Sequence, residues 1–203
     1  MKGVDSVFLA CGNVADQVAY ECAVIDESAR AGVRQIVKLS ARGAAAGAPV
    51  AYWRWHGQVE RHLKAARVPA VLLQPSFSMA NLLGAADHVR QRGMLFAPAG
   101  LARISMIDPA DVAAVAAVAL TTTGHDGRTY VLTGREAITS ARVAADLSAA
   151  TGHSVGYANI PPEAAGSALV DAGMPPFAAE QIWPSLRHYG MAPRARSPTP
   201  STP

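Results

Sequence analysis

The chain has 203 residues, of which 50% are apolar and 16% charged, so it can bury a sizeable core and is not globally disordered. Its formal net charge of +3 comes from scattered arginines and forms no dense basic stripe, which argues against a nucleic-acid-binding protein. The two cysteines, Cys11 and Cys22, lack the spacing of a zinc site or a disulfide framework and fit a reducing compartment.

The N-terminal segment carries a basic residue and a short apolar run, as a secretory signal peptide does. Asp5 interrupts the start of that run, and residues 7–11 are too few for the apolar region of a signal peptide. No segment approaches the roughly 18 consecutive apolar residues that span a bilayer. We therefore expect a cytoplasmic protein with no membrane partner.

The first elements alternate between strands and helices. Residues 6–10 form a short apolar run typical of a strand buried on both faces. Asn13 is a plausible N-cap for an amphipathic helix over residues 14–31, which Gly32 ends. Residues 35–39 (QIVKL) are expected to form the next strand.

A small-residue loop at 41–50 precedes a second amphipathic helix, on which Trp55, Val59 and Leu63 share one face, and residues 70–73 form a third buried strand. This order predicts a doubly wound α/β fold with the three strands side by side and parallel. The later elements expected are a helix at 77–90, two short β segments within 94–107, a helix from Pro109, a strand at 129–132, a helix at 140–150 capped by Thr139 or Ser140, a strand at 154–160, helices at 161–172 and 175–189, and a disordered tail from Ala192.

A dinucleotide-binding fold normally holds the pyrophosphate at a helix N-terminus that follows a GxGxxG turn. The sequence has no such turn. The nearest candidates, Gly43 and Gly47, have the wrong spacing and lack the Lys and Ser/Thr of a P-loop. We interpret this segment as a flexible loop.

Tyr52 and His56 are four residues apart on the second helix and therefore share a face. A tyrosine with a basic neighbour one turn away is the arrangement of a phenolic general acid whose pKa is lowered by positive charge. The alternative is an aromatic and a polar residue that only flank the start of a helix.

Small or polar residues follow the predicted strands, and in an open α/β sheet ligands bind beyond the carboxyl ends of the strands. Cys11 and Gly12 follow the first strand, Ser40 follows the second and Ser76 the third. Together they define one rim of a ligand site. Each taken alone could equally be a capping residue.

Five segments of the chain carry a resemblance to a known family: HGQVERHL, PSFSMANLL, GVDSVFLAC, AGVRQIVKLSA and ISMIDPADVAAVAAVAL. In these segments the sequence resembles the NmrA-like branch of the atypical short-chain dehydrogenases/reductases. The resemblance covers residues 1 to about 190. The branch includes quinone reductases, NAD(P)H azoreductases and non-catalytic NADP sensors.

The resemblance implies a fold in three parts. Family members begin with a further segment that holds the first three strands and the glycine-rich turn. This chain then corresponds to a partial Rossmann-type doubly wound parallel sheet, the later strands only, with a small C-terminal α+β region on the substrate side. We expect an NAD(P)-binding part at 1–135, a substrate-side part at 136–190 and a tail at 191–203.

The resemblance also implies positions for a site. His56 stands where many relatives carry the active-site lysine, and a neutral imidazole gives a weaker positive potential than an ammonium. Tyr52 stands at the place of the catalytic tyrosine, as proton donor. Ser40 matches an orienting serine. The expected cofactor contacts are Cys11, Gly12 and Asn13 beside the adenosine, Ser40, His56 near the nicotinamide ribose, and Pro75, Ser76 and Phe77 beside the nicotinamide, with Phe77 also packing against the substrate.

The implied function is an NAD(P)-dependent oxidoreductase that passes hydride from NAD(P)H to a small electrophile such as a quinone. A non-catalytic NADP-sensing regulator and an inactive fragment are the alternatives. The choice between NADP and NAD stays open, because the discriminating residue follows a strand outside this sequence.

An apolar edge strand at residues 6–10 would carry unpaired backbone N–H and C=O groups, which invite strand addition. We therefore expect this polypeptide, expressed alone, to bind NADPH weakly or not at all and to self-associate through that edge.

Overall fold

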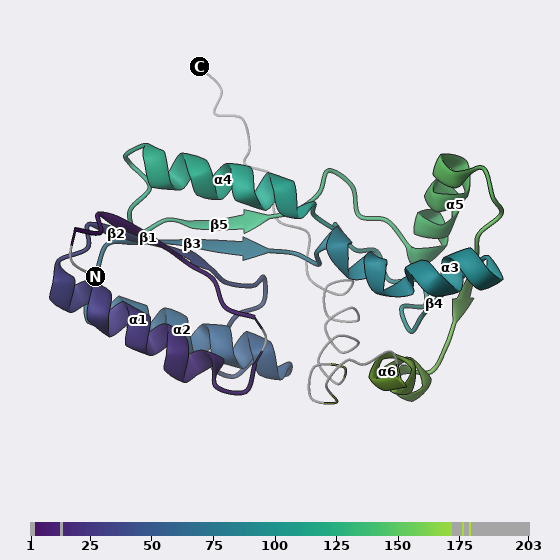
Figure 1. Cartoon of the computed structure of the whole chain (residues 1–203), viewed down its shortest axis with the longest axis horizontal. Coiled ribbons are helices and arrows are strands. Elements are labelled where there is room, and N and C mark those ends of the chain that lie inside the picture. The colour runs from purple at the N-terminus through teal and green to yellow at the C-terminus, as the bar shows by residue number, and fades with distance from the viewer. Residues whose placement is uncertain (1–2, 13, 172–175, 177–178, 180–203) are drawn as a thin grey trace, which may run out of the picture.

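The computed structural model describes residues 3–12, 14–171, 176 and 179. Figure 1 shows their arrangement. The elements in chain order are β1 (Ser6–Leu9), α1 (Gln17–Ala31), β2 (Gln35–Leu39), α2 (Ala51–Ala66), β3 (Ala70–Pro75), η1 (Met79–Ala85), α3 (Ala86–Arg92), β4 (Met94–Ala97), α4 (Pro109–Thr121), β5 (Thr129–Leu132), α5 (Ser140–Thr151), β6 (Gly156–Asn159) and α6 (Pro162–Asp171).

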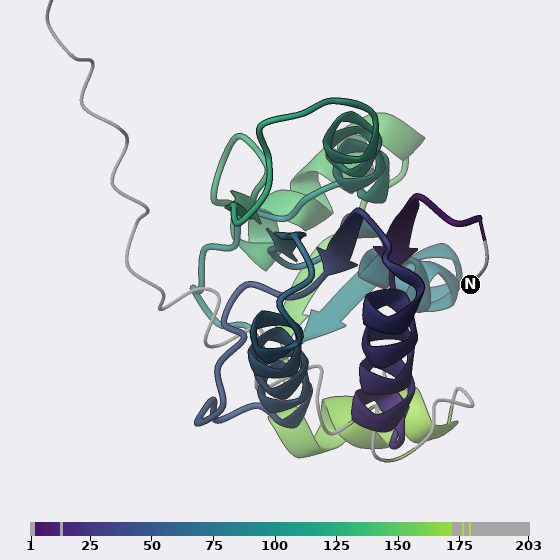
Figure 2. The same cartoon turned by 90° about the vertical axis from the view of Figure 1, so that its left-hand side faces the viewer.

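The main sheet has the strand order β1-β2-β3-β5, and all its neighbouring pairs are parallel. Helix α4 covers one face of the sheet and α1 and α2 cover the other (Figure 1). Figure 2 shows α1 and α2 packed side by side. The doubly wound, Rossmann-type α/β fold is therefore confirmed, and β5 adds a fourth strand beside β3.

The central strand β2 is buried on both faces, because successive side chains point to opposite sides of the sheet. Ile36 packs toward α1 and α2 in a cluster with Ile25 and Val59. Val37 packs toward α4 with Leu73. Lys38, two residues after Ile36, therefore points into the space between the sheet and the helices α1 and α2.

A second, two-stranded sheet pairs β4 with β6 in parallel. It lies at the other end of the molecule with α3, α5 and α6 around it (Figure 1). Strand β4 lies in the part predicted from the sequence as 1–135 and β6 in the part predicted as 136–190, so this small sheet joins the two predicted parts.

Several predicted boundaries hold. Strand β2 has the predicted bounds, α4 begins at Pro109, and Gly32 ends α1 in the left-handed conformation, with φ 69°. Asp108 and Thr139 cap α4 and α5 by accepting from backbone N–H groups. The helix predicted at 175–189 and the tail from Ala192 lie outside the described residues, apart from isolated positions.

One prediction on local structure was wrong. Helix α1 was expected to begin at Val14 but begins at Gln17, with Asp16 as N-cap. The backbone first makes a turn, in which the Gln17 N–H donates to the carbonyl oxygen of Val14. Asn13, the predicted N-cap, lies outside the described residues. The helical prediction for residues 77–90 is confirmed, as a 3₁₀ helix followed by the short α3.

The predicted apolar face of α2 is confirmed at Val59 and Leu63, which are buried. Trp53 is its buried tryptophan, whereas Trp55 is only half-buried. The reason is the loop before the helix: Gly43, at φ 99°, lies against the Trp53 ring, and a Cβ atom at Gly43 would come within 3.0 Å of it. The loop thus covers Trp53, whereas Trp55 stays half-buried.

Candidate functional site

The carboxyl ends of the parallel strands meet at one edge of the main sheet, and helix α2, which returns antiparallel to the strands, begins there. The structure brings the predicted rim to this edge. Cys11 is half-buried and Gly12 exposed after β1, while Ser40 and Ser76 are buried after β2 and β3. Asn13 lies outside the described residues.

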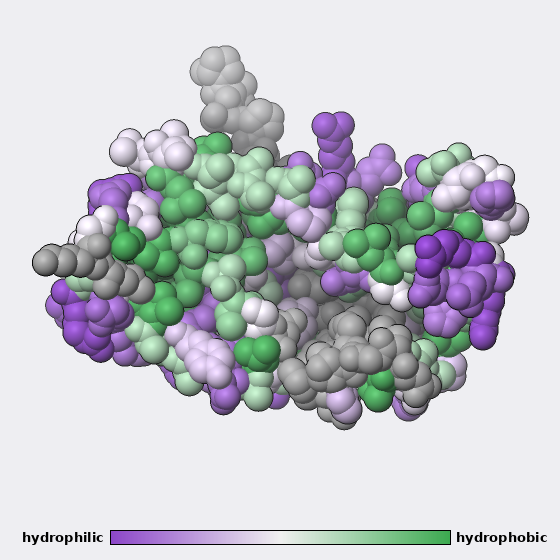
Figure 3. Space-filling view, in the orientation of Figure 1, coloured by the Kyte–Doolittle hydropathy of each residue, from purple (hydrophilic) through white to green (hydrophobic). Residues whose placement is uncertain are grey.

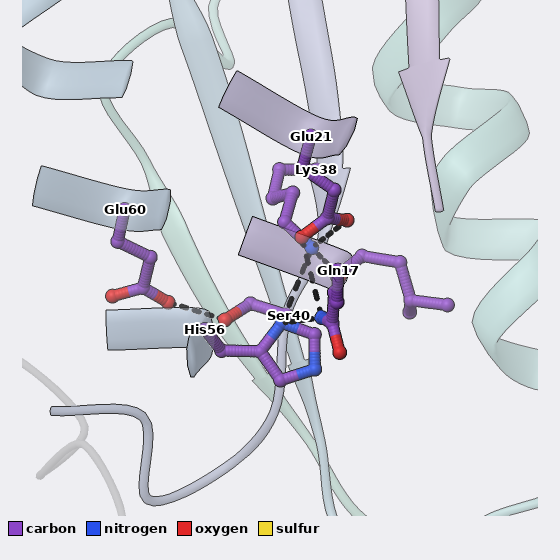
Figure 4. A network of polar contacts seen from close by, with 7 residues as sticks. Gln17, Glu21, Lys38, Ser40, His56 and Glu60 are labelled. Carbon is purple, nitrogen blue, oxygen red and sulfur yellow. Dashed lines mark hydrogen bonds and ion pairs between the residues drawn. The ribbon is translucent and has the colours of Figure 1, made fainter. Parts of the chain in front are cut away.

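A buried polar network fills the space between β2, α1 and α2 (Figure 4). Lys38 of β2 forms an ion pair with Glu21 of α1, with Nζ 2.8 Å from Oε1, and both side chains are almost completely buried. Lys38 Nζ also lies 3.2 Å from His56 Nδ1, on α2. The amide nitrogen of Gln17 lies 3.3 Å from the same ring nitrogen and 3.2 Å from Glu21 Oε2.

This environment sets the charges of the network. Burial, and then the nearby Lys38 ammonium, lowers the pKa of His56 to about 3, so the imidazole is neutral at physiological pH. Burial also lowers the pKa of Lys38, while the ion pair with Glu21 acts in the opposite direction. The positive charge of this edge therefore resides on Lys38 and not on the histidine.

Ser40 and Glu60 form a second polar pair beside this network. The Ser40 hydroxyl donates to Glu60 Oε1, which also accepts from the Gln74 amide at 2.9 Å. Glu60 thus ties the end of β2 to β3 and α2. The Ser40 proton is engaged within the protein.

Tyr52 lies in the first turn of α2, half-buried, with its ring perpendicular to that of His56 and the ring centroids 6.3 Å apart. It packs against the cluster that contains Trp53 and Phe77. The predicted proximity of Tyr52 and His56 on one helix face is therefore observed, and Tyr52 also joins the residues that follow β3.

The segment after β3 combines an apolar wall with a polar group. Pro75 ends the strand, and Phe77 is buried in the apolar cluster beside Tyr52. Between them, the Ser76 hydroxyl is buried and has no hydrogen-bond partner among the described residues. A buried polar atom without a partner is costly, and a ligand bound at this edge could satisfy it.

Four residues of this site were not singled out from the sequence: Gln17, Glu21, Lys38 and Glu60. Two signals could have found the first three. Lys38 is the one charged residue of the buried strand β2, which places a charge in the core. Gln17 and Glu21 are one turn apart on the face of α1 that packs on the sheet.

The site fits one end of a nicotinamide dinucleotide better than the other. The unpaired Ser76 hydroxyl and the apolar Phe77 are suited to a flat amide-bearing ring, and His56 to a sugar hydroxyl. The sequence contains no GxGxxG turn for the pyrophosphate. No group of three or more His, Cys, Asp or Glu side chains in the described part of the chain could hold a metal ion.

Residues 1–193 match the model of the NmrA-like family. The NAD(P)H azoreductase of Xenophilus azovorans is 40% identical over 182 residues, which are 90% of this chain and 64% of the azoreductase. This chain thus spans less than two thirds of that relative. Within the described residues, no helix is long and apolar enough to cross a membrane.

Solved structures share the fold. The NADPH-dependent quinone oxidoreductase of Escherichia coli, complexed with NADPH, superposes with a TM-score of 0.85 at 27% identity, covering 94% of this chain and 67% of the oxidoreductase. The triphenylmethane reductase of Citrobacter sp. complexed with NADP(H) superposes with a TM-score of 0.83 at 20% identity, covering 96% of this chain and 70% of the reductase, and shows the fold alone.

Proposed function

Because the chain belongs to the NmrA-like family, we propose that it is an NAD(P)H-dependent reductase homologue that acts on a small electrophile such as a quinone or an azo compound. The observation that carries this proposal is the gathering of His56, Ser76 and Phe77 at the carboxyl edge of the sheet, which is the ligand-binding edge of such folds. The names of the relatives support the substrate class.

NAD(P)H, when bound, would supply the hydride. The residues of this chain bind and orient it. His56 would hold the nicotinamide ribose, and Pro75, Ser76 and Phe77 would line the nicotinamide side. Cys11 and Gly12 would lie nearer the adenosine.

Tyr52 would be the proton donor to the reduced substrate, since it shares the helix face of His56 and the apolar cluster of Phe77. Ser40 acts indirectly in this proposal, because its hydroxyl donates to Glu60. It would stabilise the end of β2 on which the site is built.

The experiment is a quinone-dependent NADPH oxidation assay with the purified chain, in parallel with Phe77→Ala and with Leu101→Ala, a control at an exposed loop position remote in sequence from the site residues. Oxidation that requires the quinone and decreases in Phe77→Ala alone supports the proposal. Absence of quinone-dependent oxidation at an NADPH concentration shown to occupy the site, however weak its binding, would contradict it.

A second candidate function is a non-catalytic NADP-sensing regulator. The neutral state of His56 favours it, because the proton relay loses the cation expected at that position. Dinucleotide binding without turnover on any quinone or azo compound would identify this case.

We also propose self-association through β1, one of the two edge strands of the main sheet. Phe8 of this strand is 44% exposed, and Val118 of the neighbouring helix α4 is 52% exposed. Figure 3 shows apolar surface over this region. An exposed edge with apolar side chains is a template for strand addition. We further propose that the protein is located in the cytoplasm and has no nucleic-acid partner.

A further inference from the structure

The buried Lys38 has no role in the reaction proposed above, although it lies against the histidine of the site. A lysine in the core of a sheet is unusual, since burying an ammonium is costly unless it is paired. Here its Nζ forms the ion pair with Glu21 Oε1 and lies within hydrogen-bonding reach of His56 Nδ1 and the carbonyl oxygen of Leu39. Lys38 therefore fits this position as a fully engaged ammonium.

The second neighbour of His56 Nδ1 is the amide of Gln17. Its nitrogen lies near both His56 Nδ1 and Glu21 Oε2, at 3.3 and 3.2 Å. The opposite orientation of the amide would turn its oxygen toward the Glu21 carboxylate, which is repulsive. The Gln17 amide is therefore a second donor toward His56.

Two donors that converge on Nδ1 require this nitrogen to be the acceptor. A neutral imidazole carries its single proton on the other nitrogen, so Nε2 is protonated. Within the described residues Nε2 has no hydrogen-bond partner. The histidine thus has a single N–H donor, Nε2–H, which is directed away from the network.

We propose that Lys38 is a positioning residue for His56: it holds the imidazole in the neutral Nε2–H tautomer and places the positive charge of this edge directly behind it. This proposal rests on the proposed function where it identifies the acceptor, a ribose hydroxyl oxygen of the dinucleotide. The ammonium polarises the ring through Nδ1, which strengthens Nε2–H as a donor. Together, Lys38 of β2 and His56 of α2 thereby supply an N–H donor, Nε2–H, with a positive charge on the opposite side of the ring.

The charged and titratable groups around this pair come from three elements. Glu21 faces Lys38 from α1, and Glu60 acts on it from α2. Cys11, after β1, also acts on Lys38. Tyr52 lies beside the ring on α2. Glu21 is the group that would attract a proton to His56 if the ammonium were removed.

The test is solid-state ¹⁵N NMR of sedimented, histidine-labelled chain without dinucleotide, with the His56 signals assigned by their absence in His56→Gln. Sedimentation makes the measurement independent of self-association. We expect an unprotonated Nδ1 and a protonated Nε2, unchanged between about pH 7.5 and about pH 5, where exposed histidines become charged. A protonated Nδ1, or an imidazolium at about pH 6, would overturn the proposal.

Variants separate positioning from packing. In Lys38→Met, we expect a proton to appear on His56 Nδ1, because the ammonium that occupied this nitrogen is gone and the unpaired Glu21 carboxylate attracts a proton to this side of the ring. Lys64→Met, at an exposed position in the last turn of α2, should leave the His56 signals unchanged. Unchanged signals in a folded Lys38→Met would overturn the proposal.

If Lys38→Met does not fold, Glu21→Gln is the second arm. This variant keeps the Lys38 nitrogen as a donor to His56 Nδ1 and nearly the same shape, so the Nε2–H tautomer should persist, and a switch of the proton to Nδ1 would overturn the proposal. Because the experiment contains no dinucleotide, its outcome is independent of the quinone assay. Loss of that activity would overturn only the proposed function.

Discussion

The Ser40 hydroxyl oxygen lies 2.5 Å from Glu60 Oε1, and this contact joins the end of β2 to helix α2. Ser40 is buried, and Glu60 also accepts from Gln74 of β3. A serine predicted as a ligand-orienting group is thus part of the internal support of the site.

Ser40→Ala should lower the free energy of unfolding by about 1–3 kcal/mol, because it leaves a partly buried carboxylate with one donor fewer. Urea unfolding followed by circular dichroism measures the change. Ser167→Ala, whose hydroxyl bonds a helix carbonyl at an exposed position, should change it by less than about 0.5 kcal/mol. Equal changes in the free energy of unfolding of the two variants would show that the Ser40–Glu60 contact does not stabilise the protein.

The low pKa of His56 predicts a loss of stability in acid. The folded state holds this histidine neutral down to about pH 3, whereas the unfolded chain protonates it near 6.5. The unfolded state therefore binds more protons between these values, and stability falls as pH decreases through this window, by up to about 1.4 kcal/mol per pH unit from this group.

Urea unfolding of His56→Gln should show a shallower dependence on pH than the wild type between about pH 6.5 and 5, above the range where most carboxylates titrate. His153→Gln, at an exposed position, should retain the wild-type slope. A wild-type slope in His56→Gln would mean that His56 titrates normally in the folded state.

Gly57 allows helix α2 to pack against the loop that precedes it. A Cβ atom at this position would lie 2.4 Å from the carbonyl carbon of Ala45, a backbone atom that cannot move away alone. Gly57→Ala should therefore destabilise the protein by about 1–3 kcal/mol in thermal or urea unfolding, despite the higher helix propensity of alanine.

Gly166→Ala on α6 is the matched control. Among the described residues, no heavy atom lies within 4 Å of the place that a Cβ atom would take there, so alanine should be neutral or stabilise by up to about 1 kcal/mol. If Gly57→Ala were likewise neutral or stabilising, α2 could not pack as closely against the loop as the structure shows. Because Gly57 follows His56, the variant would also shift the site.

The exposed edge predicts concentration-dependent association of the chain. Phe8→Lys places a charge on β1 and should reduce the weight-average mass in sedimentation velocity toward that of a monomer. Leu101→Lys, at a loop residue 91% exposed, introduces the same charge elsewhere and should leave the mass unchanged. A wild-type chain that stays monomeric at all concentrations would contradict self-association.

The sequence was informative where the signal is local. The bounds of β2 follow from the apolar run QIVKL, and the shared face of Tyr52 and His56 follows from their spacing. The start of α1 was placed too early, because Val14 is apolar at helical spacing yet belongs to a turn. Periodicity cannot separate these two cases.

The contacts of the buried network depend on how the elements pack and not on spacing along the chain. Lys38 and His56 are separated by 18 residues and a loop, and their contact exists only because α2 returns over the face of β2 that carries Lys38. The same holds for Ser40 and Glu60. The sequence showed an unusual lysine in a core strand, but its partners required the fold.

The central claim is that the carboxyl edge of this sheet binds the nicotinamide end of NAD(P)H. Saturation-transfer difference NMR with NADPH tests it most directly, because the method detects weak binding and resolves the two ends of the ligand. We predict stronger saturation of the nicotinamide protons than of the adenine protons, and a loss of this contrast in Phe77→Ala but not in Leu101→Ala. Saturation that is absent, or that is strongest on the adenine, would contradict the claim.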